Sequence, residues 1–305
     1  MQDATIRSRF ILLGQTSPVL GSISLFSNNE PIMIQKMTVI LSAASPSIES
    51  LLLYDNNKRY LGRANLDTSD DTGKKYVVSI PTGNLTLPKQ QTVILYVRGT
   101  VRSANQGGVS GQVVQANSFV LEGNGEWSSE GYTQTFADTF PVFQTSRARI
   151  TAVQNAGSAT DTFVSGPGRQ ISSFRFMGDG ESEGLAALKL TGLTLQIDGG
   201  SSIALSNVSL RREGTNETMN CSSSTTEVTC SSIPAVIGTL QGGQTTLTVF
   251  ADIFVASGVT NPTLRLTLNQ PGTVSTAGAI SWTDGSATFS WVPFDAPVAR
   301  GTQYQ

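Results

Sequence analysis

One stretch of the sequence occurs twice, and this internal repeat limits the fold more than any other feature. Residues 80–97 and 233–250 both read Ile-Pro, four residues, Thr-Leu, three residues, Gln-Thr, and then an apolar run. The identical positions match without a gap: Ile80, Pro81, Thr86, Leu87, Gln91 and Thr92 with Ile233, Pro234, Thr239, Leu240, Gln244 and Thr245. Such a repeat indicates two copies of one structural unit.

The repeat extends upstream into two alternating runs, residues 32–41 and 188–197. Each run alternates apolar and polar residues, slips by one residue at Gln35-Lys36 or at Thr191-Gly192, and then alternates again. A slip in a period-two pattern predicts a β-bulge. We therefore expect a bulged strand at the same place in both copies.

The repeat also extends to the end of each copy, where Trp127 resembles Trp282, and Ala148-Arg149 matches Ala299-Arg300. We expect a first domain over residues 1–150 and a second over 151–305, with a linker at 150–162. Each is of ordinary domain size.

The apolar segments are short, alternating and rich in β-branched residues, and turn residues recur about every 8–12 positions. No amphipathic helix of useful length is present. The pattern predicts an all-β chain of two tandem antiparallel β-sandwich domains. Immunoglobulin-like topology is the expected order of strands, and a jelly roll is the alternative.

Composition excludes several classes of partner. The net charge is −2 and the sequence pI is about 5.3, without the basic stripe that nucleic acid requires. No apolar run approaches the roughly 18 residues that span a bilayer. We expect neither a nucleic-acid partner nor a membrane span.

The residue types give no support for an enzyme. The chain has no histidine, which removes Ser-His-Asp and Cys-His nucleophiles and the usual zinc sites. It also lacks a phosphate-binding Gly-Lys-Ser or Gly-Lys-Thr motif. We assign no catalytic residue.

The two cysteines, Cys221 and Cys230, are separated by eight residues. This spacing suits a cross-strand bridge near the end of a hairpin, and a close pair favours a disulfide and an oxidising compartment. The alternative is two reduced thiols. The first copy has no cysteine, so the bridge would reinforce the second copy alone.

Calcium is the one cofactor that the sequence suggests. In the loop at residues 178–184, carboxylates alternate with small residues at Asp179, Glu181 and Glu183, a pattern that could wrap the ion. The EF-hand pattern fails, however, because its twelfth position is Leu190 and not Glu. The competing interpretation is a solvated hairpin tip.

The two matched tryptophans have two interpretations. Trp127 and Trp282 could be platforms on which sugar rings stack, or they could cap the two cores. Their matching places in both copies favour the structural role.

With the repeat assigned, the chain resembles tandem immunoglobulin-like repeats of prokaryotic cell-surface proteins, among them surface-layer, adhesin-stalk and filament subunits. The resemblance lies in the alternating run from Leu188 to Ile197, the run from Thr239 to Phe250 with Ala251-Asp252, and their first-copy partners. It implies a structural or binding role outside the cell and brings no catalytic residues.

The leading hypothesis is an extracellular structural protein that assembles with copies of itself into a surface layer or filament. Unpaired sheet edges accept strands from neighbours, and Phe10, Ile11, Leu12 and Leu13 could be such a donated strand. A carbohydrate-binding or adhesive module that recognises surface glycans is the second hypothesis. A virion decoration protein is the third.

Overall fold

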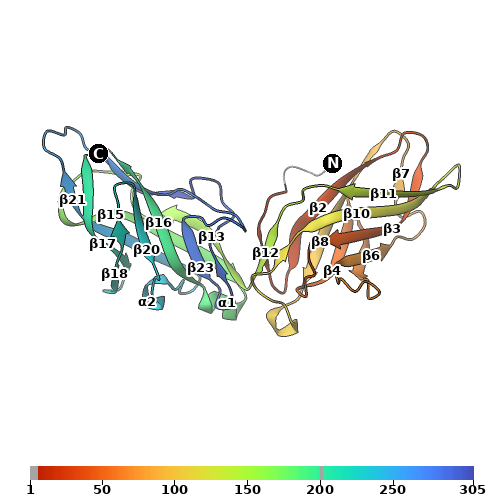
Figure 1. The fold of residues 1–305 in the computed structure, drawn as a ribbon, viewed down its shortest axis with the longest axis horizontal. Helices are drawn as coiled ribbons and strands as arrows, with labels where there is room; N and C mark the ends of the chain where they lie inside the picture. The colour runs from red at the N-terminus through yellow and green to blue at the C-terminus, as the bar shows by residue number, and fades with distance from the viewer. Residues whose placement is uncertain (1–5, 200–201) are drawn as a thin grey trace. The chain divides into compact units, whose positions relative to one another are not determined.

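The computed structural model describes residues 6–199 and 202–305, and its regular secondary structure is almost entirely β-strand (Figure 1). The chain forms two compact units, the first ending at Ser146 and the second beginning at Arg147. The boundary thus lies slightly before the expected one after residue 150. No described helix is long and apolar enough to cross a membrane.

The first unit contains twelve strands and one short 3₁₀ helix in its described part. They are β1 (Phe10–Leu12), β2 (Thr16–Phe26), β3 (Ile32–Leu41), β4 (Ile48–Asp55), β5 (Tyr60–Leu66), β6 (Lys75–Ser79), β7 (Thr86–Leu87), β8 (Thr92–Val101), η1 (Ala104–Gln106), β9 (Val113–Val114), β10 (Ala116–Gly125), β11 (Gly131–Ala137) and β12 (Phe143–Ser146).

The main sheet of this unit has the strand order β11-β10-β3-β6-β5-β4-β8-β2. Strands β5 and β6 share only two register pairs, and the sheet folds over there into two layers. Across the core Gly21 of β2 faces β10, where an added Cβ would lie 3.0 Å from the ring of Phe119. The apolar positions of alternating strands fill the space between the layers.

The second unit contains fourteen strands and two short helices in its described part. They are β13 (Ala148–Asn155), β14 (Thr160–Asp161), β15 (Gly166–Gly180), α1 (Ser182–Ala187), β16 (Lys189–Gly199), β17 (Ile203–Arg212), β18 (Thr218–Asn220), β19 (Ser222–Ser223), β20 (Glu227–Ser231), α2 (Ala235–Gly238), β21 (Gln244–Val255), β22 (Leu264–Leu268), β23 (Ile280–Thr283), β24 (Thr288–Phe289), β25 (Ala299–Arg300) and β26 (Gln303–Tyr304).

Its two sheets have the strand orders β13-β15-β21-β17-β18 and β14-β26-β22-β16-β20-β19. The expected all-β sandwich is therefore confirmed in both units. In the second unit β13 and β15 are neighbours in one sheet, as the first two strands of an immunoglobulin domain are, and the longer strands from β15 to β22 then alternate between the two sheets.

Among the described strands, each unit contains a short parallel pair, so neither sandwich is purely antiparallel. In the first unit β1 runs parallel to β12, and in the second β14 runs parallel to β26. In each case a strand near the start of the unit pairs with its last strand. The shared pairing supports the duplication that the sequence repeat indicates.

The predicted β-bulges are confirmed at the same place in both copies. Gln35 is left out of the register between β3 and β10, and Thr191 is left out between β16 and β23. The carbonyl of each bulged residue accepts a hydrogen bond from the repeated isoleucine: Ile80 donates to Gln35 at 2.7 Å, and Ile233 to Thr191 at 3.0 Å. In both copies the isoleucine of the repeated Ile-Pro motif is therefore hydrogen-bonded to the bulge.

The expected linker at residues 150–162 is wrong, because most of it belongs to the second sandwich. Strand β13 pairs antiparallel with β15 from Ala148 opposite Gly180 to Asn155 opposite Phe174. Ile150 of this strand is 1% exposed, so it is part of the core. The residues that directly follow the last strand of the first unit are therefore an edge strand of the second.

Candidate functional site

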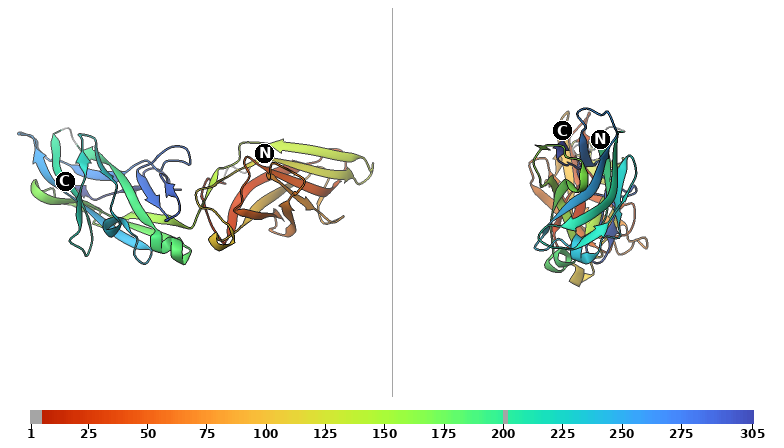
Figure 2. Two further views of the ribbon diagram at one scale, coloured as in Figure 1. Left: turned by 60° about the horizontal axis from the view of Figure 1, so that its bottom comes forward. Right: turned by 90° about the vertical axis from the view of Figure 1, so that its left-hand side faces the viewer.

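A buried carboxylate organises one end of the first unit. Glu30, 7% exposed, lies before β3 and accepts four hydrogen bonds from the β10–β11 turn and the start of β11. The donors are the backbone N–H groups of Trp127 (2.9 Å) and Ser128 (3.0 Å), the Ser128 hydroxyl (2.6 Å) and the Tyr132 hydroxyl (2.9 Å). The long β10–β11 hairpin that they hold is visible in Figure 2.

These donors stabilise the charged form of the carboxyl group. The hydroxyl of Ser128, followed by its backbone N–H, lowers the pKa of Glu30 to about 2. The same carboxylate raises the pKa of Tyr132, because a hydrogen bond to Glu30 favours the protonated phenol. Glu30 is therefore an anion that fixes the turn and not a proton donor at neutral pH.

The turn that Glu30 fixes presents an exposed tryptophan. Trp127 is 66% exposed, and the Nζ atom of Lys89 lies 5.3 Å from the centroid of its ring. A large aromatic ring on a fixed turn can stack against a flat ligand. The expectation that Trp127 caps the core is wrong.

Trp282 has the opposite environment, so the two tryptophans are not equivalent. It is 0% exposed, its ring stacks on Phe289 at 4.3 Å, and its Nε1 donates to the carbonyl of Trp291 at 2.9 Å. The structural interpretation holds for Trp282, and a sugar platform is excluded there by burial.

An apolar groove of about 150 Å³ lies beside this turn, between the end of β2 and the β10–β11 hairpin. Its lining residues carry no charge and include Leu25 and Phe26 from β2, Ile34 from β3, and Tyr132 and Phe136 from β11. Phe26 is 55% exposed, an unusual position for a phenylalanine. Large exposed apolar patches mark binding surfaces.

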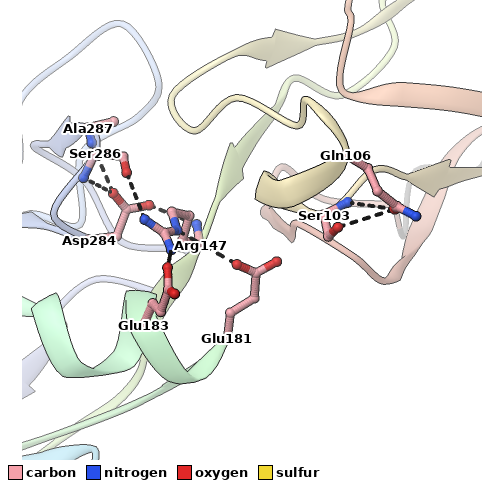
Figure 3. Close-up of polar contacts among 8 residues, drawn as sticks. All are labelled: Ser103, Gln106, Arg147, Glu181, Glu183, Asp284, Ser286 and Ala287. Atoms are coloured by element: carbon pink, nitrogen blue, oxygen red, sulfur yellow. Dashed lines mark hydrogen bonds and ion pairs between the residues drawn. The ribbon is translucent and has the colours of Figure 1, made fainter.

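The three carboxylates predicted to bind calcium each pair with an arginine. Asp179 accepts from Nε of Arg149 at 3.0 Å, and Glu181 and Glu183 both contact the guanidinium group of Arg147 (Figure 3). Within the described residues no group of three or more His, Cys, Asp or Glu residues is arranged to hold a metal. Calcium stays a prediction, which the neighbouring cations disfavour.

The backbone of Arg147 is also held in place. Its N–H donates to Oδ2 of Asp284 at 2.8 Å, and its carbonyl accepts from the N–H of Glu181 at 2.9 Å (Figure 3). Arg147 directly precedes β13, so these contacts fix the start of that strand. The acidic loop therefore serves as an anchor for β13 in this structure.

The predicted assembly strand lies inside its own unit. Residues Phe10 to Leu12 form β1, which pairs with Gln144 to Ser146 of β12, and Leu13 donates its N–H to the carbonyl of Ser146 at 2.9 Å. All four side chains from Phe10 to Leu13 are no more than 4% exposed. The segment is part of the core here, and its donation to a neighbour stays a prediction.

The cysteines form one bond. Cys221 lies between β18 and β19, Cys230 lies in β20, and a disulfide joins them across the hairpin. The N–H of Cys221 also donates to the carbonyl of Val208 in β17 at 2.8 Å. The bridge therefore sits where the chain passes from one sheet of the second unit to the other.

No family model matches the sequence, and no curated protein matches it. Among solved structures, the C-terminal domain of the Streptococcus agalactiae AgI/II polypeptide BspA is 7% identical, with 93% of each chain covered and a TM-score of 0.28. The C-terminal domain of the Streptococcus pyogenes antigen I/II-family protein AspA is 10% identical, covering 86% of this chain and 90% of that one, with a TM-score of 0.25. The collagen-binding domain of Erysipelothrix rhusiopathiae surface protein RspB is 9% identical, covering 100% and 92%, with a TM-score of 0.23. Similarity this low carries no argument about this chain.

Proposed function

We propose that this chain is an extracellular structural protein that joins to neighbouring polypeptides, copies of itself among them, by adding strands to sheet edges. The observation that carries the proposal is β13. This strand directly follows the last strand of one unit and forms the edge of a sheet in the next. The backbone groups of an edge strand can pair with a strand of another molecule.

Two further features support this proposal. The disulfide between Cys221 and Cys230 suits an oxidising compartment outside the cytosol. The chain also lacks histidine, so the proposal assigns it no catalytic reaction. Only 14% of the residues are charged. Neighbouring copies of such a surface repel each other little, which suits close packing in a surface layer or filament.

The experiment is to follow the purified chain by sedimentation velocity over a wide concentration range and by negative-stain microscopy. We expect ordered filaments or sheets, with larger species growing as the concentration rises. A chain that stays monomeric at every concentration and forms no ordered object would overturn self-assembly.

A specific observation favours a second function, adhesion to surface glycans. Trp127 has an exposed ring on a turn fixed by Glu30, which is the geometry a sugar-stacking platform requires. A glycan array should then show binding that Trp127→Ala abolishes. Phe254→Ala is the matched control, because Phe254 is 59% exposed and lies in the second unit. Equal glycan binding by the two variants would eliminate this function.

A further inference from the structure

The two copies differ at one sheet edge. In the second unit β15 lies between β21 and β13, so both of its edges are paired. Its counterpart in the first unit is β2, which among the described residues pairs with β8 alone. The first unit therefore has no described strand at the place that β13 occupies in the second.

The equivalence of β2 and β15 follows from their pairing with the repeated strands β8 and β21. Buried Ile23 and Leu25 of β2 lie opposite Leu95 and Val93. Their counterparts in β15 are two buried phenylalanines, with Phe174 opposite Leu247 and Phe176 opposite Thr245. Strand β13 pairs with the part of β15 from Phe174 to Gly180. The corresponding edge in the first unit thus starts at Ile23 and includes Phe26.

The apolar groove lies along this same edge. Leu25 and Phe26 form one wall, and Tyr132, Thr133 and Phe136 of β11 form the other. In the second unit β13 places Ile150 in the core with 1% exposure and Val153 with 9% exposure. The groove in the first unit is lined by uncharged residues and suits aliphatic side chains of this kind.

We infer that this groove and the adjoining edge of β2 receive an extended segment of a partner polypeptide, with the chemistry of β13. Such a segment forms backbone hydrogen bonds with the edge and inserts two aliphatic side chains, spaced as Ile150 and Val153 are, into the groove. The inference rests on the proposed function, and it names the site and the kind of segment that binds.

The test uses the full chain and a labelled synthetic peptide of residues 147–155, followed by fluorescence anisotropy. The second unit already holds its own β13, so the peptide should bind the first unit. We expect saturable binding that Phe26→Lys weakens at least about tenfold, because a charge then enters the groove. Phe254→Lys, at an equally exposed phenylalanine in the other unit, should leave binding unchanged. A peptide with aspartate in place of both Ile150 and Val153 should not bind.

Hydrogen exchange locates the bound peptide. Amides of residues 23–27 should gain protection, while those of β15 should not change. No peptide binding, equal binding by Phe26→Lys, or protection confined to the second unit would overturn the inference.

The two proposals fail separately. Normal filaments or sheets from a chain that binds no peptide would overturn the groove and leave the proposed self-assembly standing. Peptide binding by a chain that stays monomeric at every concentration would overturn the proposed self-assembly and leave the groove standing.

Discussion

The hydroxyl of Tyr132 donates a hydrogen bond of 2.9 Å to the carboxylate of Glu30, although the two residues are 102 positions apart in the sequence. Together with the bonds from Trp127 and Ser128, it ties the β10–β11 hairpin to the start of β3. The exposed Trp127 and one wall of the apolar groove are both positioned by this contact. Stability of this end of the unit should therefore depend on the charge of one carboxyl group.

The first prediction concerns pH. Because folding lowers the pKa of Glu30 from 4.5 to about 2, its contribution is fully present above pH 4.5 and is lost as the pH falls toward 2. Glu30→Gln should be less stable than the parent chain at pH 7, and the difference should shrink between pH 5 and 2. Urea midpoints measured across this range check it. A difference that is constant with pH would show that Glu30 does not act through its charge.

The second prediction separates the two tryptophans. Trp282→Ala removes a fully buried ring and should lower the free energy of unfolding of the second unit by about 3–5 kcal/mol. Trp127→Ala removes an exposed ring and should change stability by no more than about 0.5 kcal/mol. Urea unfolding followed by circular dichroism measures both. Equal losses would mean that Trp127 is a core residue in solution.

The sandwich and its bulges could be predicted because they depend on local pattern. Alternation reports which face of a strand is buried, and a slip at Gln35 or Thr191 displaces the pattern by one residue. Where the alternation is strong, the predicted inward-facing residues are buried: Ile80 is 3% exposed and Ile233 is 4% exposed. Such features need no knowledge of what lies across the core.

The repeat gave wrong predictions where identical residues in the two copies were assumed to be structurally equivalent. Arg149 lies in the first strand of the second unit, whereas Arg300 lies in its last part, so the two are not equivalent. Thr92 is exposed and Thr245 is buried, which shows that the ungapped match slips by one residue at β8 and β21. A one-residue slip exchanges the two faces of a strand, and identity of letters cannot reveal it.

Most of the candidate site could not be predicted from the sequence. The predicted linker was rich in small polar residues near its middle, which concealed the strand that ends at Asn155. Glu30 stands in a turn motif with Pro31, and nothing local shows that its partners come from residues 127–132. Phe26 and Phe136 can be recognised in the sequence as apolar residues. That they line a common groove is known only from the three-dimensional structure.

The third prediction concerns the disulfide. Reducing the bond between Cys221 and Cys230 frees a short loop in the unfolded chain and should destabilise the second unit by about 2–4 kcal/mol. The first unit has no cysteine, so its unfolding should not respond to the reductant. Hydrogen exchange with and without reductant resolves the two units. Equal destabilisation of both would contradict the local role of the bridge.

The fourth prediction concerns calcium. Since Arg147 and Arg149 already form ion pairs with Asp179, Glu181 and Glu183, adding about 5 mM calcium should leave the melting temperature unchanged. Differential scanning calorimetry with calcium and then with EDTA is the measurement. A rise in melting temperature that EDTA reverses, and that Glu183→Gln abolishes, would establish a calcium site there.

The fifth prediction tests whether β1 belongs to its own unit or to a neighbour. Ile11 is 0% exposed and pairs with Thr145 of β12, so its side chain packs in the core of a single chain. Ile11→Ala should lower the free energy of unfolding by about 2–5 kcal/mol at every protein concentration, because the lost contacts are intramolecular. Val109→Ala, at a site 48% exposed in the same unit, is the control and should have little effect. If β1 is instead donated between chains, the loss caused by Ile11→Ala will depend on concentration, since dilution alone would already separate the strand from its acceptor.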